Sequence, residues 1–72
     1  MTDANRLKSA MALIGITQSE LASVIGISRN ALSNKMNNKT TFNQKEISVI
    51  SKTLKLSSDD INRIFFAVDV DK

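Results

Sequence analysis

A single glycine separates two short helical patterns in the middle of this chain of 72 residues, and this spacing restricts the folds open to it. Glycine adopts a positive φ at little cost, so Gly26 can end one helix. Ser28 can cap the next one by accepting hydrogen bonds from its free N–H groups. Two helices joined this tightly cross steeply and need a small residue where they meet, which Ala22 supplies. We therefore expect a tight helical corner over residues 18–37.

The composition favours an all-α fold. The chain has no proline and two glycines, which suits short helices joined by tight corners and argues against a hairpin-rich β fold. Cysteine and histidine are absent, so we expect no disulfide, no metal and no cofactor. The longest mostly apolar run, residues 10–16, is too short to span a bilayer. We therefore expect no membrane association and a cytoplasmic location.

Capping residues and apolar spacing predict five helices. The expected helix starts are Thr2 or Asp3, Thr17, Ser28, Asn43, and Ser57 or Ser58. The expected buried faces are Leu7, Ala10, Met11 and Ile14; Leu21, Ala22 and Ile25; Ile47, Ile50 and Leu54; and Ile61, Ile64 and Phe65. Gly15 and the pair Asn37–Asn38 are expected to end helices in the left-handed conformation. We predict one domain over residues 1–66, followed by a short tail, residues 67–72.

The helix expected after Ser28 has a polar face without a carboxylate. On a helical wheel, one arc contains one guanidinium, three amides and a hydroxyl, whereas the opposite side packs. The polar arc is Arg29, Asn30, Ser33, Asn34 and Asn37, and the packing side is Ala31, Leu32, Lys35 and Met36. Arg, Asn and Ser side chains can hydrogen-bond base edges in a major groove, whereas a solvated helix usually mixes Glu and Lys.

Residues 18–37 resemble the helix-turn-helix of the phage Cro/CI repressor family. Members often carry Gln first, then a small residue, a glycine and a branched aliphatic residue, which match Gln18, Ala22, Gly26 and Leu32. The likeness extends to the flanking helices, and the chain is similar to short Cro-like regulators of temperate phages. Two positions depart from the pattern: Lys35 is commonly apolar, and Met36 is often Glu. We expect the Lys35 stem to lie along the core while its ammonium reaches water.

The resemblance implies a compact five-helix domain of the lambda-repressor type whose third helix enters the major groove of double-stranded DNA. Base contacts are then expected from Arg29, Asn30, Ser33 and Asn34. Contacts to the DNA backbone are expected from Gln18, Ser28, Asn37, Lys39 and Thr40, although simple turn chemistry also accounts for the last three. Because one motif covers only an operator half-site, a homodimer is expected for tight binding.

The C-terminal part leaves other functions open. Residues 1–55 hold eight Lys/Arg against three Asp/Glu, whereas residues 56–72 hold two against four. Phe66 lies off the last apolar face: it either closes the core or forms, with Val68 and Val70, an apolar patch for a second copy or another protein.

One alternative is therefore an antirepressor that binds a partner CI-type repressor and binds DNA weakly. An antitoxin and an ordinary corner in a small helical bundle are further alternatives. No catalytic constellation is visible, so an enzyme is not expected. Asp59 and Asp60 are attributed to a helix N-terminus rather than to a metal site.

Overall fold

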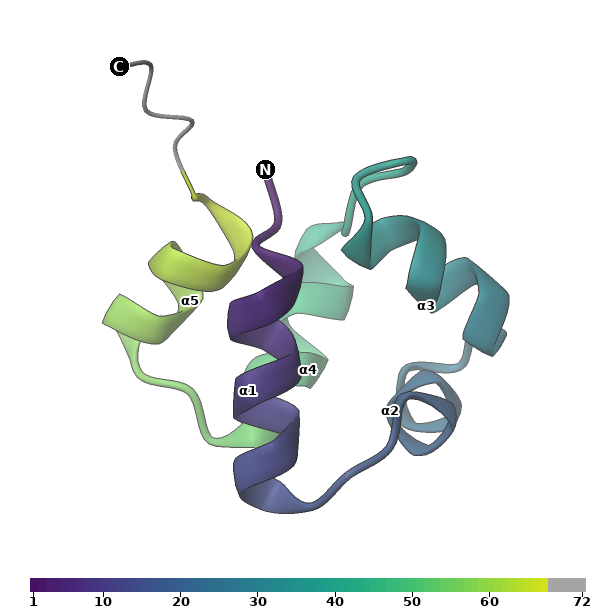
Figure 1. Ribbon diagram of the computed structural model, residues 1–72, viewed down its shortest axis with the longest axis horizontal. Coiled ribbons are helices and arrows are strands. Elements are labelled where there is room, and N and C mark those ends of the chain that lie inside the picture. Colours follow the sequence, from purple (N-terminus) through teal and green to yellow (C-terminus); the bar gives the residue numbers. More distant parts are fainter. Residues whose placement is uncertain (68–72) are drawn as a thin grey trace.

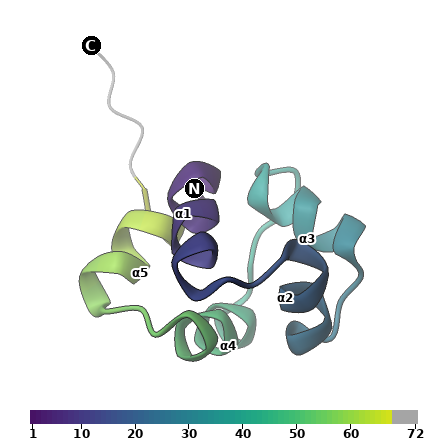
Figure 2. The ribbon, with the colours of Figure 1, turned by 60° about the horizontal axis from the view of Figure 1, so that its bottom comes forward.

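The computed structural model describes residues 1–67, which form five α-helices and no β-strand (Figure 1). The helices are α1 (Ala4–Ile14), α2 (Gln18–Ile25), α3 (Arg29–Met36), α4 (Gln44–Leu54) and α5 (Ser58–Phe65). The all-α, five-helix prediction is confirmed. Helices α1 and α4 pack together in the centre, with α5 on one side and the α2–α3 pair on the other (Figures 1 and 2). None of the helices described has the length and apolarity that a membrane span requires.

Every helix begins at a polar side chain that accepts a hydrogen bond from an N–H group of the first turn. These N-caps are Asp3, Thr17, Ser28, Asn43 and Ser57. Helices α2, α4 and α5 have complete capping boxes, because Glu20, Glu46 and Asp60 accept from the cap backbone in return. This accounts for the Asp59–Asp60 pair as part of a helix start. Within residues 1–67, no group of three His, Cys, Asp or Glu side chains could hold a metal ion.

Four residues in the left-handed conformation follow the helices. Gly15 and Gly26 have φ of +83° and +90°, and Asn38 has φ of +64°, as the sequence predicts. Lys55, with φ of +56°, ends α4 in the same way, which was not predicted. At the corner between α2 and α3, the N–H groups of Gly26 and Ile27 both donate to the Ala22 carbonyl, at 2.9 and 3.0 Å. These bonds end α2 and set the direction of α3.

Replacing Gly26 with Ala is expected to destabilise the fold by about 1–2 kcal/mol, because an L-residue adopts positive φ at that cost. An added Cβ meets no atom within 4 Å, so the loss comes from the backbone and not from a clash. Urea unfolding measures it. Gly26→Asn is the control, because Asn tolerates this conformation and should lose less. Equal losses for Ala and Asn would contradict this explanation.

The core is built from two buried hydrophobic side chains of each helix. It consists of Leu7, Met11, Leu21, Ala22, Leu32, Met36, Ile50, Leu54, Ile64 and Phe65. Phe42, in the loop before α4, adds an edge-to-face contact with Phe65, with ring centroids 5.3 Å apart. One expected core residue is misplaced: Ile14 is 45% exposed, because the last turn of α1 borders an open groove.

Candidate nucleic-acid interface

Helix α3 lies at the outer edge of the molecule, with its packing on α2 (Figures 1 and 2). Its inner face is anchored by Leu32 and Met36, which are 0% and 2% exposed. The steep corner at Gly26 and this anchoring together fix which face of α3 is turned outward. The first residues of α3, Arg29 and Asn30, are both exposed.

The other two expected base-contacting residues are less open. Ser33 and Asn34 lie one turn later on α3 and are half-buried. The loop after α3 folds back at this point, and the Asn34 carbonyl accepts from the N–H groups of Lys39 and Thr40, at 2.9 and 3.4 Å. The structure thus brings four polar side chains together on the outer side of α3, with the two at its start the most accessible.

The side chains expected to contact the DNA backbone surround the start of α2, the corner and the loop. Gln18 is the half-buried first residue of α2. The Ser28 hydroxyl accepts from Ala31 N at 3.0 Å, so its cap role is filled while its own O–H remains able to donate. Lys39 and Thr40 are exposed in the loop. Asn37 donates to the Ser33 hydroxyl at 3.4 Å, which shows the turn chemistry that was the alternative for this residue.

The capping box of α2 holds the start of that helix in place. The N–H of Thr17 donates to Glu20 Oε1 at 2.9 Å, and Glu20 N donates back to the Thr17 hydroxyl at 3.1 Å. Both hydrogen bonds lower the pKa of Glu20, the one from the Thr17 backbone N–H more than the one with the Thr17 side chain. The Glu20 carboxylate of the cap therefore stays ionised as the pH falls toward the ordinary pKa of a glutamate.

Residues 7–61 match the protein family described as Helix-turn-helix, which spans α1 from Leu7 to the first turn of α5. The chain belongs to the Cro/CI-type helix-turn-helix family. Domains of this family are DNA-binding domains of transcriptional regulation. No curated protein matches the chain. The matched range contains the whole α2–α3 corner.

Lys35 departs from the Cro/CI pattern in sequence, and its side chain contacts the loop and α4. Its Nζ donates to the Thr41 carbonyl at 3.0 Å and lies 3.1 Å from Glu46 Oε1. The Lys35 and Glu46 side chains are only 17% and 11% exposed. The sequence predicts a core-lying stem and an ammonium in water. The structure adds two protein partners for that ammonium, the loop carbonyl and the α4 carboxylate.

The amide of Asn38 forms a second link that the sequence did not reveal. Its Oδ1 accepts from Thr2 N at 2.8 Å, and its Nδ2 donates to the Thr2 carbonyl at 2.9 Å. The same N-terminal segment is bonded to the end of α5, because Asp3 N donates to the Ile64 carbonyl and Ala67 N donates to the Met1 carbonyl. The loop after α3 is thus bonded to the N-terminal segment, which is in turn bonded to the end of α5.

Phe66, which follows α5, has an exposed side chain. It is 56% exposed, which excludes the alternative that it closes the core, whereas its neighbour Phe65 is buried. Val68 and Val70, the other members of the expected patch, lie outside the described residues.

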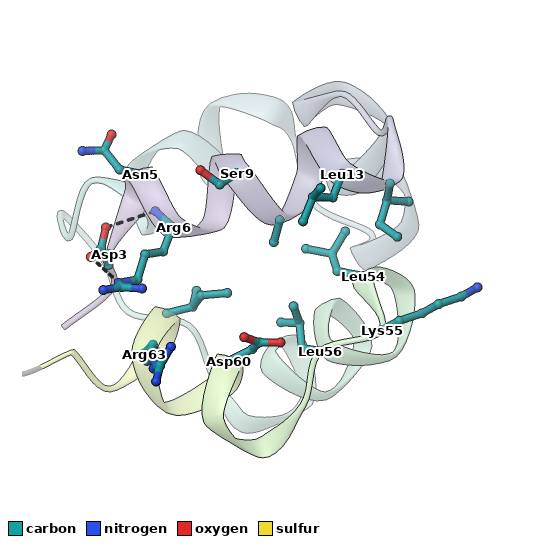
Figure 3. Close-up of a pocket in the computed structure, with 13 residues that line it drawn as sticks. Asp3, Asn5, Arg6, Ser9, Leu13, Leu54, Lys55, Leu56, Asp60 and Arg63 are labelled. Carbon is teal, nitrogen blue, oxygen red and sulfur yellow. Dashed lines mark hydrogen bonds and ion pairs between the residues drawn. The ribbon is translucent and has the colours of Figure 1, made fainter.

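A groove of about 640 Å³ runs between α1 and α5 (Figure 3). Leu13, Leu54 and Leu56 line one end of it, and Arg6 and Arg63 lie toward the other, with Asp60 between them beside Leu56.

Proposed function

We propose that this protein is a phage transcriptional regulator of the lysis/lysogeny type that binds operator DNA through α3, in the cytoplasm of the bacterial host. The observation that carries the proposal is the exposed start of α3. Arg29 and Asn30 are open there, and the helix contains no carboxylate to repel phosphate or to occupy the guanidinium. The family membership supports the same placement, with α3 as the recognition helix.

The roles follow from the chemistry of each side chain. Arg29 is suited to a bidentate contact with guanine, and Asn30 or Asn34 to a bidentate contact with adenine. Ser33 donates to or accepts from either base. The surrounding side chains then hold the duplex by its phosphates; they are Gln18, Ser28, Asn37, Lys39 and Thr40. Because one motif covers one half-site, the proposal includes a homodimer on an operator with two half-sites.

The exposed ring of Phe66 favours a second candidate function. An apolar side chain this open, beside an acidic C-terminal part, suits a contact with another protein. The partner we propose is a CI-type repressor, to which this protein would bind as an antirepressor. It would then resemble the Cro-like modulator-of-repression proteins of temperate lactococcal phages. DNA binding by this chain alone would then be weak.

Selection from random double-stranded DNA, with this chain alone and with the CI-type repressor encoded beside it, separates the two functions. The DNA-binding proposal predicts that the chain alone enriches a defined sequence. The antirepressor proposal predicts no enrichment by the chain alone, and loss of the repressor's own enriched sequence in the mixture. A chain that neither enriches DNA nor changes the repressor's selection would contradict both.

The salt dependence of binding gives a quantitative check on the backbone contacts. Replacing Lys39 with Ala should reduce the slope of log K against log salt by about 0.9, because one phosphate loses its cation. Fluorescence anisotropy on the selected DNA measures the slope. The matched control is Lys55→Asn, which removes an exposed lysine at the groove between α1 and α5 and keeps a side chain suited to its left-handed backbone. Equal slopes for the parent and Lys39→Ala would contradict the assignment.

A further inference from the structure

We propose that Lys35 is a positioning residue that holds the loop after α3 in shape for contact with DNA phosphate, without touching DNA itself. This inference rests on the proposed function for the role of the loop. Lys35 lies on the packing side of α3, and its ammonium is directed away from the exposed start of the helix, into a contact with two oxygen atoms.

The two contacts of Lys35 attach α3 to different parts of the chain. The Thr41 carbonyl belongs to the end of the loop, and Glu46 belongs to the first turn of α4. Glu46 Oε1, 3.1 Å from the ammonium, also accepts from Asn43 N at 2.9 Å, within the capping box that starts α4. One cation therefore connects the recognition helix, the end of the loop and the cap of the next helix.

The loop is closed by two neighbouring residues of α3. The Asn34 carbonyl accepts from Lys39 N and Thr40 N, and the Lys35 ammonium donates to the carbonyl of Thr41. Lys39 and Thr40, whose backbone N–H groups form the first of these attachments, keep their side chains exposed. An exposed lysine on a loop that is already ordered loses less conformational freedom when it binds phosphate, so the attachment raises affinity without adding a contact.

Helix α3 makes few other contacts with α4. Helix α3 packs mainly on α2, whereas α4 packs on α1, α2 and α5. The nearly buried Lys35–Glu46 pair spans α3 and α4, and its burial protects it from the screening that weakens surface ion pairs. Lys35 stands at a position that is commonly apolar in the family, and Glu46 is its structural partner.

The test replaces the charged pair with neutral side chains of similar size. In the double variant Lys35→Met and Glu46→Gln, the glutamine oxygen can still accept from Asn43 N, so the α4 cap is kept. Circular dichroism checks that the helices are retained. Amide hydrogen exchange, measured without DNA, should then show that the N–H groups of Lys39 and Thr40 exchange at least about tenfold faster than in the parent. Lys45→Met, at an exposed lysine of α4, removes one positive charge elsewhere and should leave this exchange unchanged.

DNA-binding measurements distinguish a positioning role of Lys35 from a role in stability alone. In the parent, Lys39→Ala should weaken binding by roughly eightfold at 0.1 M salt, which corresponds to one phosphate contact. In the double variant, the same replacement should have almost no further effect, because the loop no longer presents Lys39. A Lys39→Ala effect of equal size in both backgrounds would overturn the positioning role.

Two further outcomes complete the test. Lys35→Arg keeps donors for both oxygens and should retain slow exchange of Lys39 and Thr40, and this variant also serves if the double variant does not fold. Fast exchange in Lys35→Arg would count against the proposal. If the parent protein neither enriches a DNA sequence nor binds DNA, the proposed function fails. If the parent binds DNA but the N–H groups of Lys39 and Thr40 exchange at the same rate in the folded double variant, only the role of Lys35 is refuted.

Discussion

Replacing Leu32 with Ala is expected to lower the free energy of unfolding by about 2–5 kcal/mol. Leu32 is fully buried, and it anchors the inner face of α3 in the common core. The loss combines the transfer free energy of the removed methyl groups with the cavity that they leave. Domains of this size bury a modest core, so a loss of this size removes a large share of their stability.

Urea unfolding followed by circular dichroism measures this change, with Leu13→Ala as the matched control. Leu13 is also a helical leucine, but it is 88% exposed, and its truncation should change the stability by no more than about 0.5 kcal/mol. The comparison isolates burial, because the chemical change is the same at both positions. Similar losses for the two variants would show that the core does not depend on Leu32 as described.

Replacing Arg29 with Ala is expected to weaken operator binding by about 1–3 kcal/mol and to relax the choice of base at one position. Asn34→Ala should behave in the same way at another position. Both side chains are polar groups of α3, and the proposed function assigns them hydrogen bonds to base edges rather than a role in core packing. The stability of both variants should stay close to that of the parent, since Arg29 is exposed and Asn34 is half-buried at the edge of the loop.

Arg63→Ala is the matched control for this experiment. Arg63 is an exposed arginine on α5, beside the groove and on the side of the molecule opposite α3 (Figures 1 and 3). Its loss changes the net charge by the same amount as the loss of Arg29 but removes no group from α3. Titration of the selected DNA and of single-base variants measures affinity and specificity together. If Arg29→Ala and Asn34→Ala both retard the selected DNA as well as the parent does, the recognition role of α3 is wrong.

The helices were predictable from sequence because their ends are decided locally. A cap such as Thr17 with Glu20, or a glycine such as Gly26, acts within a few residues, so its effect can be predicted from the local sequence. The side of α3 that packs was also predictable, because its spacing alone places Leu32 and Met36 together.

The contacts that were missed depend on how separate elements approach one another. The pairing of Lys35 with Glu46 requires the first turn of α4 to lie next to α3, and no periodicity encodes that distance. The exposure of Ile14 and Phe66 has the same origin, because each has apolar neighbours in sequence but lies where no other element covers it. The link between Asn38 and Thr2 joins residues 36 positions apart.

The hydrogen bond from Ala67 N to the Met1 carbonyl closes a ring that encompasses almost all of the described chain. Because the packing of α1 on α5 already brings the two ends together, this backbone bond is expected to open before the core contacts do. Thr2, whose backbone holds the Asn38 amide, then loses a neighbouring support. Fraying of the termini should therefore loosen the segment after α3, which is distant in sequence but adjacent in space.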